Sequence, residues 1–154
     1  VNPADGTCDV CEESLNAATT TVTVSIVDYA SANNWVNGTQ YSTIKMNDDI
    51  SVTAVKTTGN NNNTGKYYTN GNDWRIYQTE TPAITVTAAE GKTIKSVKIT
   101  YNVANTGVLT NGTTKITSGT TVEVNANTIT FGVGNTGSAT NGQVKITAIE
   151  VIYA

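Results

Sequence analysis

The chain has 154 residues, a mass of 16.1 kDa and a formal net charge of −3, a length typical of one domain with a buried core. It contains no His, which excludes a Ser-His-Asp triad, a Cys-His pair and the common zinc sites. It has no basic footprint for nucleic acid and no apolar run near the roughly 20 residues that span a membrane, so neither partner is expected.

The composition indicates where the protein works. Thr occurs 30 times and Asn 19 times, and charged residues make up 14% of the chain, against about a quarter in an average protein. Richness in Thr, Asn and Gly with few Lys and Glu is typical of secreted bacterial β-proteins. We therefore expect a secreted or cell-surface bacterial protein. The first residue is Val, which suggests a processed chain whose signal peptide has been removed.

Residues 1–17 are interpreted as a junction from an upstream catalytic or surface module of the same parent chain. This segment holds both cysteines, Cys8 and Cys11, in a C-x-x-C motif. Such a motif can be a tight disulfide loop, half of a metal site in a larger parent, or a redox pair. We favour the disulfide or linker, because the chain offers no other soft metal ligand and the next segment gives at most one helical turn.

Residues 18–154 are predicted to form one β-sandwich binding module. Apolar and polar residues alternate in 20–27, 50–56 and 84–87 and again around Val122 and Phe131, which indicates half-buried strands. Residues 28–33 can form a short helical turn with Asp28 as its cap. Four Asn-Gly pairs are hairpin signals, at positions 37–38, 70–71, 111–112 and 141–142. About ten short strands of this kind predict an all-β fold, an antiparallel β-sandwich or jelly roll.

Two internal repeats extend this interpretation. Residues 94–101 and 146–153 share the pattern I-x-x-[VI]-x-[IV]-x-Y. After the first Ile, the alternation of inward-pointing apolar residues is displaced by one position. A β-bulge absorbs such a slip, so we expect two long, central strands with bulges. The triplet Asn-Thr-Gly followed by Thr-Asn-Gly begins at Asn63, Asn105 and Asn135. It is either repeated hairpin chemistry or a set of loops at one edge that carry ligand contacts.

Carboxylates are the acid–base groups that remain. A glycosidase needs two of them facing each other across a cleft. No pair stands out here, so no catalytic residue and no enzyme is predicted. Asp48, Asp49 and Asp73 lie in Asn-rich loops and are weak candidates for a structural calcium, which prefers oxygen ligands; the alternative is a solvated turn. No other cofactor is expected.

Aromatic residues give the clearest functional signal. Six of the ten fall into two clusters along the chain. A sugar ring stacks on a flat aromatic face, while its hydroxyls bind short polar side chains. The sequence therefore predicts a polysaccharide or oligosaccharide site formed by aromatic residues and their polar neighbours: Trp35, Tyr41, Tyr67, Tyr68, Asn70, Asp73, Trp74, Arg75 and Tyr77.

Strand parity leaves some of these residues with two possible roles. Trp74 shares a face with the next apolar residue and is favoured as a core residue, whereas Arg75 and Tyr77 face the other way. Arg75 is the only Arg and can bind sugar hydroxyls or staple a loop. Tyr67 and Tyr68 point to opposite sides, so one of them is expected to be buried.

The same stretches carry a resemblance. Residues 28–39 (DYASANNWVNGT), 63–68 (NTGKYY), 74–78 (WRIYQ) and 134–144 (GNTGSATNGQV) resemble a carbohydrate-binding-module-like β-sandwich of secreted multidomain bacterial proteins. The similarity covers residues 20–154. It implies a noncatalytic accessory domain that targets its parent to a plant or microbial polysaccharide. No established binding residue is carried over, and the loop residue Trp35 is equally consistent with a binding platform and with packing.

Two expectations about partners follow. The low charge favours a neutral glycan over an acidic one, and we expect the chain to be a monomer. The alternative function is a structural or adhesive cell-surface domain that contacts protein partners. That alternative predicts mostly buried aromatic residues, with an apolar patch or an open sheet edge as the contact.

Overall fold

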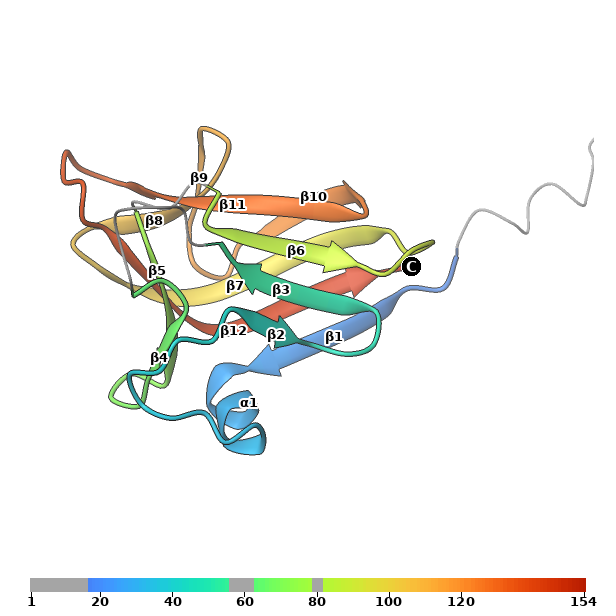
Figure 1. Cartoon of the computed structure of the whole chain (residues 1–154). Helices are drawn as coiled ribbons and strands as arrows, with labels where there is room; N and C mark the ends of the chain where they lie inside the picture. Colours follow the sequence, from blue (N-terminus) through green and yellow to red (C-terminus); the bar gives the residue numbers. More distant parts are fainter. Residues whose placement is uncertain (1–16, 56–62, 79–81) are drawn as a thin grey trace, which may run out of the picture.

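The computed structural model describes residues 17–55, 63–78 and 82–154, and all but the last residue of the predicted junction, Cys8 and Cys11 included, lies outside them. Twelve strands and one helix, α1 (Ile26–Ala32), form in these residues (Figure 1). The strands are β1 (Thr20–Ser25), β2 (Thr43–Lys45), β3 (Ile50–Ala54), β4 (Lys66–Tyr68), β5 (Asp73–Tyr77), β6 (Ile84–Ala88), β7 (Ile94–Ala104), β8 (Gly107–Asn111), β9 (Thr114–Ile116), β10 (Thr121–Ala126), β11 (Thr128–Asn135) and β12 (Gln143–Tyr153).

The strands form two antiparallel six-stranded sheets. One has the order β10-β7-β12-β5-β4, with β1 also paired to β12, and the other has the order β2-β3-β6-β11-β8-β9. The first part of β12 pairs with β5 and its second part pairs with β1. The predicted antiparallel sandwich is therefore confirmed, whereas its jelly-roll form stays a prediction.

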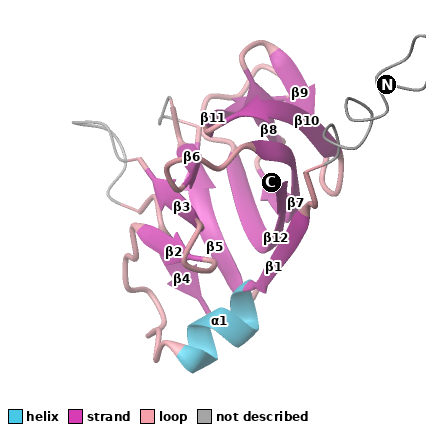
Figure 2. Ribbon diagram, turned by 90° about the vertical axis from the view of Figure 1, so that its right-hand side faces the viewer, coloured by secondary structure: helices cyan, strands magenta, loops and turns pink. Residues whose placement is uncertain are grey.

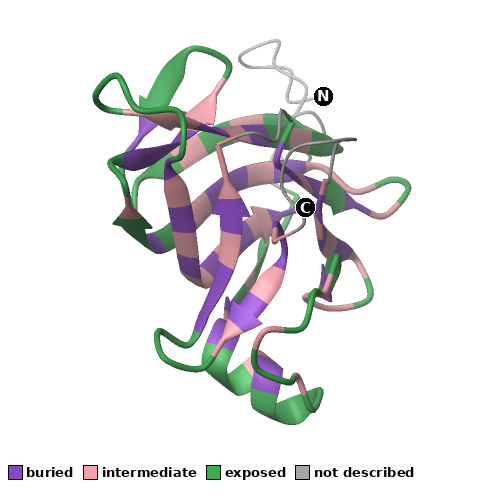
Figure 3. Cartoon of the chain, turned by 60° about the vertical axis from the view of Figure 1, so that its left-hand side comes forward, coloured by how far each residue is buried: buried purple, intermediate pink, exposed green. Residues whose placement is uncertain are grey.

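The core lies between the two sheets and follows the alternation of the sequence. In β3, Ile50, Val52 and Ala54 are buried, whereas Ser51 and Thr53 are half-buried on the other face. Figure 3 shows the same alternation of buried and intermediate residues along the neighbouring strands. Threonine can occupy the outer positions without adding charge, because its β-branched side chain suits the pleated surface.

The long repeat forms the two central strands of the first sheet. β7 and β12 each have 11 residues and pair with each other. The register shifts between Ile146 and Ala148, so that no residue of β7 stands opposite Thr147, and it shifts again near Lys95. These are the places where the inward parity slips, so both predicted bulges are confirmed.

The predicted helical turn is present, but it begins earlier than expected. α1 follows β1 directly, and Ser25 occupies its N-cap without a side-chain hydrogen bond, so Asp28 lies in the first turn and is not the cap. Ile26 and Ala30, one turn apart, bury the inner side of the helix. α1 closes one end of the sandwich (Figure 2). No helix among the described residues is long and apolar enough to cross a membrane.

Two of the four Asn-Gly pairs form the predicted hairpins, and two do not. Positions 70–71 and 111–112 join β4 to β5 and β8 to β9. Positions 37–38 and 141–142 lie in longer connections. A Cβ on Gly142 would lie 2.8 Å from the Cα of Gly107. Glycine is needed there for close approach of two backbones rather than for a tight turn.

The connection after α1 covers the outer edge of β4. The Gly38 amide donates to the Tyr67 carbonyl at 2.7 Å, and the Tyr67 amide donates to the Thr39 carbonyl at 3.0 Å. The Tyr41 amide donates to the Gly65 carbonyl at 2.8 Å. This segment satisfies backbone groups that an open edge would expose, and it places Trp35 and Tyr41 beside the β4–β5 hairpin.

Candidate functional site

The hairpin of β4 and β5 carries seven of the nine predicted site residues. In its ladder, Tyr67 pairs with Trp74 and Tyr68 pairs with Asp73. Because directly opposed residues of an antiparallel pair share a face, these two pairs point to opposite sides of the sheet. The predicted site residues are therefore divided between an inner and an outer face.

The inner face belongs to the core. Trp74 has 0% of its surface exposed and Tyr67 has 4%. The indole N–H of Trp74 donates to the carbonyl oxygens of Tyr41 and Gly65, both at 2.9 Å. The interpretation of Trp74 as a core residue is confirmed. Of the two neighbours Tyr67 and Tyr68, Tyr67 is the buried one. Neither ring reaches the surface of the molecule.

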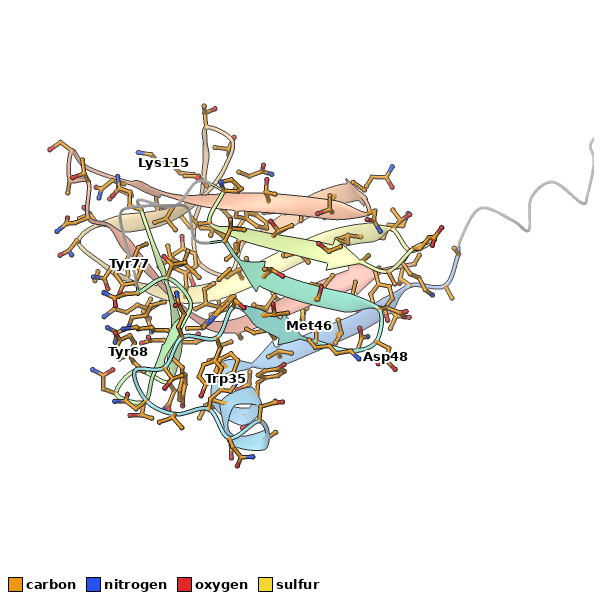
Figure 4. All side chains as sticks on the ribbon, viewed as in Figure 1. Trp35, Met46, Asp48, Tyr68, Tyr77 and Lys115 are labelled. Carbon is orange, nitrogen blue, oxygen red and sulfur yellow. The ribbon has the colours of Figure 1, made fainter. Side chains whose placement is uncertain are left out.

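Trp35 and Tyr41 form a stacked pair next to this core. Their ring centroids lie 4.3 Å apart with 3° between the planes. Tyr29 and Tyr67 meet Trp35 edge-on, at 5.3 and 5.9 Å. The Tyr41 hydroxyl accepts a hydrogen bond from the Val36 amide at 2.8 Å. Trp35 is thus a half-buried packing residue of the loop, and Figure 4 places it near α1, apart from Tyr68 and Tyr77.

Five predicted site residues gather on the outer face, and we call them the outer cluster: Tyr68, Asn70, Asp73, Arg75 and Tyr77. The Arg75 guanidinium is its centre. Its Nε donates to Asp73 Oδ1 at 2.7 Å and its Nη2 donates to Asn70 Oδ1 at 3.0 Å. The guanidinium carbon lies 4.0 Å from the centre of the Tyr68 ring, within the range of a cation–π contact.

The protonation states of this cluster follow from burial and from the Asp73 charge. Burial raises the pKa of Tyr77, because it disfavours the phenolate form. Burial opposes the charged form of Arg75 as well, but the hydrogen bond and charge of Asp73 outweigh it and raise the pKa of Arg75. At neutral pH the cluster therefore offers a cationic guanidinium beside a neutral phenol that can donate a hydrogen bond.

Asp73 is the anchor of the cluster and not a surface group. Its exposed fraction is 2%, and the side chain of Arg75 is 14% exposed. A buried carboxylate paired to a guanidinium holds that guanidinium in one orientation. Two roles were predicted for Arg75, to staple a loop or to bind sugar hydroxyls. The staple is present, since Nε and Nη2 hold Asp73 and Asn70.

The calcium candidates have other partners. No group of three or more His, Cys, Asp or Glu side chains that could hold a metal occurs among the residues that the structure describes. Each of the three carboxylates instead lies near a cation: Asp48 at 2.8 Å from Lys45, Asp49 at 4.0 Å from Lys92, and Asp73 at 2.7 Å from Arg75.

Two of the three Asn-Thr-Gly repeats meet beside the end of β5. Asn135 Nδ2 donates to Gln78 Oε1 at 3.1 Å and to the Asn105 carbonyl at 2.9 Å. Gln78 Oε1 also accepts from the Gly142 amide at 2.8 Å, and Gln78 Nε2 donates to the Ala139 carbonyl at 3.1 Å. These loops do lie together at one edge, and their polar groups bind one another. Sequence reasoning did not identify Gln78 as their centre.

Two lysines also lie on the outer face, and the sequence did not single them out. Lys66 of β4 and Lys145 of β12 both stand opposite Arg75 in the two ladders that flank β5. Gln143 stands opposite Tyr77. The pairing of β5 with β12 joins segments far apart in the chain, and no local signal reveals its register.

Comparisons with protein-family models, curated proteins and solved structures find no match for this chain. The functional assignment therefore rests on the geometry of the outer cluster and on the residues around it.

Proposed function

We propose that this chain is a noncatalytic carbohydrate-binding module that targets a secreted or cell-surface bacterial parent protein to a plant or microbial polysaccharide. The observation that carries the proposal is the outer cluster, in which Arg75 lies between Tyr68 and Tyr77 and is fixed by Asp73 and Asn70. An upstream catalytic or surface module of the same parent would supply the activity that is targeted.

The chemistry of the cluster suits a sugar. An aromatic ring offers an apolar surface to the C–H groups of a pyranose, and its hydroxyl stays available for a hydrogen bond. The guanidinium offers planar N–H donors to hydroxyl oxygens. Since Asp73 and Asn70 already hold Arg75, little side-chain freedom is lost when a ligand binds. We expect micromolar affinity, or roughly −6 to −8 kcal/mol.

The test is affinity electrophoresis in native gels that contain cellulose derivatives, xylan, mannan, xyloglucan, β-1,3-glucan or pectin. We expect selective retardation by one polymer. Tyr77→Ala should weaken it at least about tenfold, which is about 1.4 kcal/mol. Trp35→Phe, which keeps a ring against Tyr41, is the control on the other side of the hairpin and should bind as the unsubstituted protein does. If the unsubstituted protein is folded and no polymer retards it, the proposal is refuted.

The alternative is a structural or adhesive domain with protein partners, and one observation favours it. Half of the ten aromatic residues are buried: Tyr67, Trp74, Tyr101, Phe131 and Tyr153. Among the described strands, β2, β9 and β10 lie at the ends of the sheets and offer edges for pairing. If no polymer retards the protein, a Pro substitution within β2 that abolishes attachment of the parent to its partner would support this function.

A further inference from the structure

Three cations stand in one row across the outer face. Lys66 of β4 pairs with Arg75 of β5, and Arg75 pairs with Lys145 of β12 on its other side. All three are half-buried. Directly opposed residues share a face, so the three side chains leave the sheet on the same side. With neighbouring strands about 4.8 Å apart, the two lysine backbones are separated by about 10 Å.

This row is unfavourable for the free protein. Like charges directly opposite each other on a sheet destabilise it. Asp73 offsets one charge through its ion pair with Arg75. Within residues 17–55, 63–78 and 82–154, neither Lys66 nor Lys145 has an ion-pair partner. Among the described residues, two positive charges therefore remain uncompensated on one face, in a chain that has nine Lys and Arg residues.

The net charge of the whole chain does not describe this face. Four of the 12 carboxylates lie in residues 1–16, so residues 17–154 hold nine Lys and Arg against eight Asp and Glu. Exposed charges act over a Debye length of about 8 Å at physiological salt. A ligand on the outer face therefore meets the local row of cations rather than the chain's average charge of −3.

The tyrosines of the outer cluster lie on both sides of this row. Tyr77 follows Arg75 by two positions on β5 and shares its face, and Tyr68 stands opposite Asp73, two positions before Arg75. Gln143, opposite Tyr77, adds an amide on the same face. Rings beside ammonium groups match a sugar unit that carries a carboxylate, since the ring binds C–H groups and the ammonium pairs with the acid.

We propose that the outer cluster, together with Lys66 and Lys145, binds an acidic polysaccharide whose sugar units carry carboxylates. The inference rests on the proposed carbohydrate-binding function and names its class of ligand. It replaces the expectation of a neutral glycan, which considered the total charge and not its distribution over the sheet.

A matched pair of polymers tests this directly. Polygalacturonate and its fully methyl-esterified form share one backbone, and esterification removes the carboxylate charge. We expect the unsubstituted protein to bind the acid at least roughly tenfold more tightly than the ester at low salt. Added NaCl should reduce this preference by screening.

One double variant and a control assign the preference to the row of cations. Lys66→Gln combined with Lys145→Gln should remove most of the preference for the acid, measured as the ratio of the affinity for the acid to the affinity for the ester. Lys115→Gln is the control, because Lys115 lies on β9 of the other sheet (Figure 4). It should retain the full preference. The double variant should also melt at the same or a higher temperature than the parent, because like-charge repulsion is relieved.

The outcomes separate the two proposals. Equal binding of acid and ester would overturn the acidic ligand and leave the carbohydrate-binding function standing. No binding to these two or to any neutral polymer would refute the carbohydrate-binding function itself. A loss of preference in Lys115→Gln as large as in the double variant would show a diffuse charge effect and would also overturn the inference.

Discussion

Replacing Trp74 by Phe should destabilise the fold without involving the outer face. The indole has no exposed surface, and its N–H donates to the carbonyls of Tyr41 and Gly65, both at 2.9 Å. Phe keeps most of the apolar contact but removes the donor. The Gly65 carbonyl retains the Tyr41 amide as a partner. Among the described residues, the indole is the donor to the Tyr41 carbonyl, so this part-buried acceptor loses its hydrogen bond.

The cost of this change can be worked out. An orphaned buried acceptor costs about 1–3 kcal/mol, and the smaller ring leaves a void that adds about 1 kcal/mol. We therefore expect Trp74→Phe to lower the free energy of unfolding by about 3 kcal/mol. For a chain of this length the melting temperature falls by roughly 6–12 °C.

Urea unfolding measures this effect, with Trp35 as the remaining fluorophore of the variant. Trp35→Phe is the matched control and should cost about 1 kcal/mol, because its ring is half-buried and its contacts are rings rather than buried carbonyls. A loss below about 0.5 kcal/mol in Trp74→Phe would refute the hydrogen-bonded, buried placement of the indole.

Two further predictions concern other parts of the core. The Tyr101 hydroxyl donates to the Ile116 carbonyl, and burial raises the pKa of Tyr101 above its usual value of 10.0. The contribution of Tyr101 to the free energy of unfolding is therefore fully present below pH 10, and it is lost as the pH rises through the pKa of the folded state. Tyr101→Phe should cost about 1–2 kcal/mol at pH 7 and flatten the alkaline decline in unfolding free energy; equal declines in variant and parent would contradict this. Gly107→Ala should lower the free energy of unfolding by about 1–3 kcal/mol, because its Cβ would lie 2.5 Å from the Gln143 backbone. Gly137→Ala is the control and should be neutral, because the nearest atom there is 3.5 Å away. Equal melting temperatures of the two variants would contradict the prediction for Gly107.

The strands and bulges could be predicted because burial acts locally on each of them. Each strand buries one face, so the alternation of apolar residues shows which residues point inward. The slips of parity in β7 and β12 show where an extra residue must be accommodated, near Lys95 and at Thr147. The inward position of Trp74 followed from the same parity argument.

The residues of the outer cluster could be predicted because they lie close together in the chain, whereas their neighbours from other segments could not, because these depend on which strands become adjacent. Lys145 reaches Arg75 only through the pairing of β12 with β5. The Asn37-Gly38 pair lies in the connection after α1, where Asn37 Oδ1 accepts hydrogen bonds from the amide and hydroxyl of Thr69 at 3.0 and 3.1 Å. Both contacts join segments that are far apart in the chain, and neither leaves a signal in the local pattern.

The most direct test of the account is NMR mapping of the binding face. Backbone amide shifts would be followed while an oligosaccharide of the retarding polymer is titrated into the isotope-labelled protein. We expect the shift changes to concentrate on the amides of β4 and β5, at Tyr68, Arg75 and Tyr77, and on Lys145 of β12. Saturable changes confined to the Trp35 loop, or to the sheet that contains β9, would contradict the assignment of the outer cluster as the glycan-binding site.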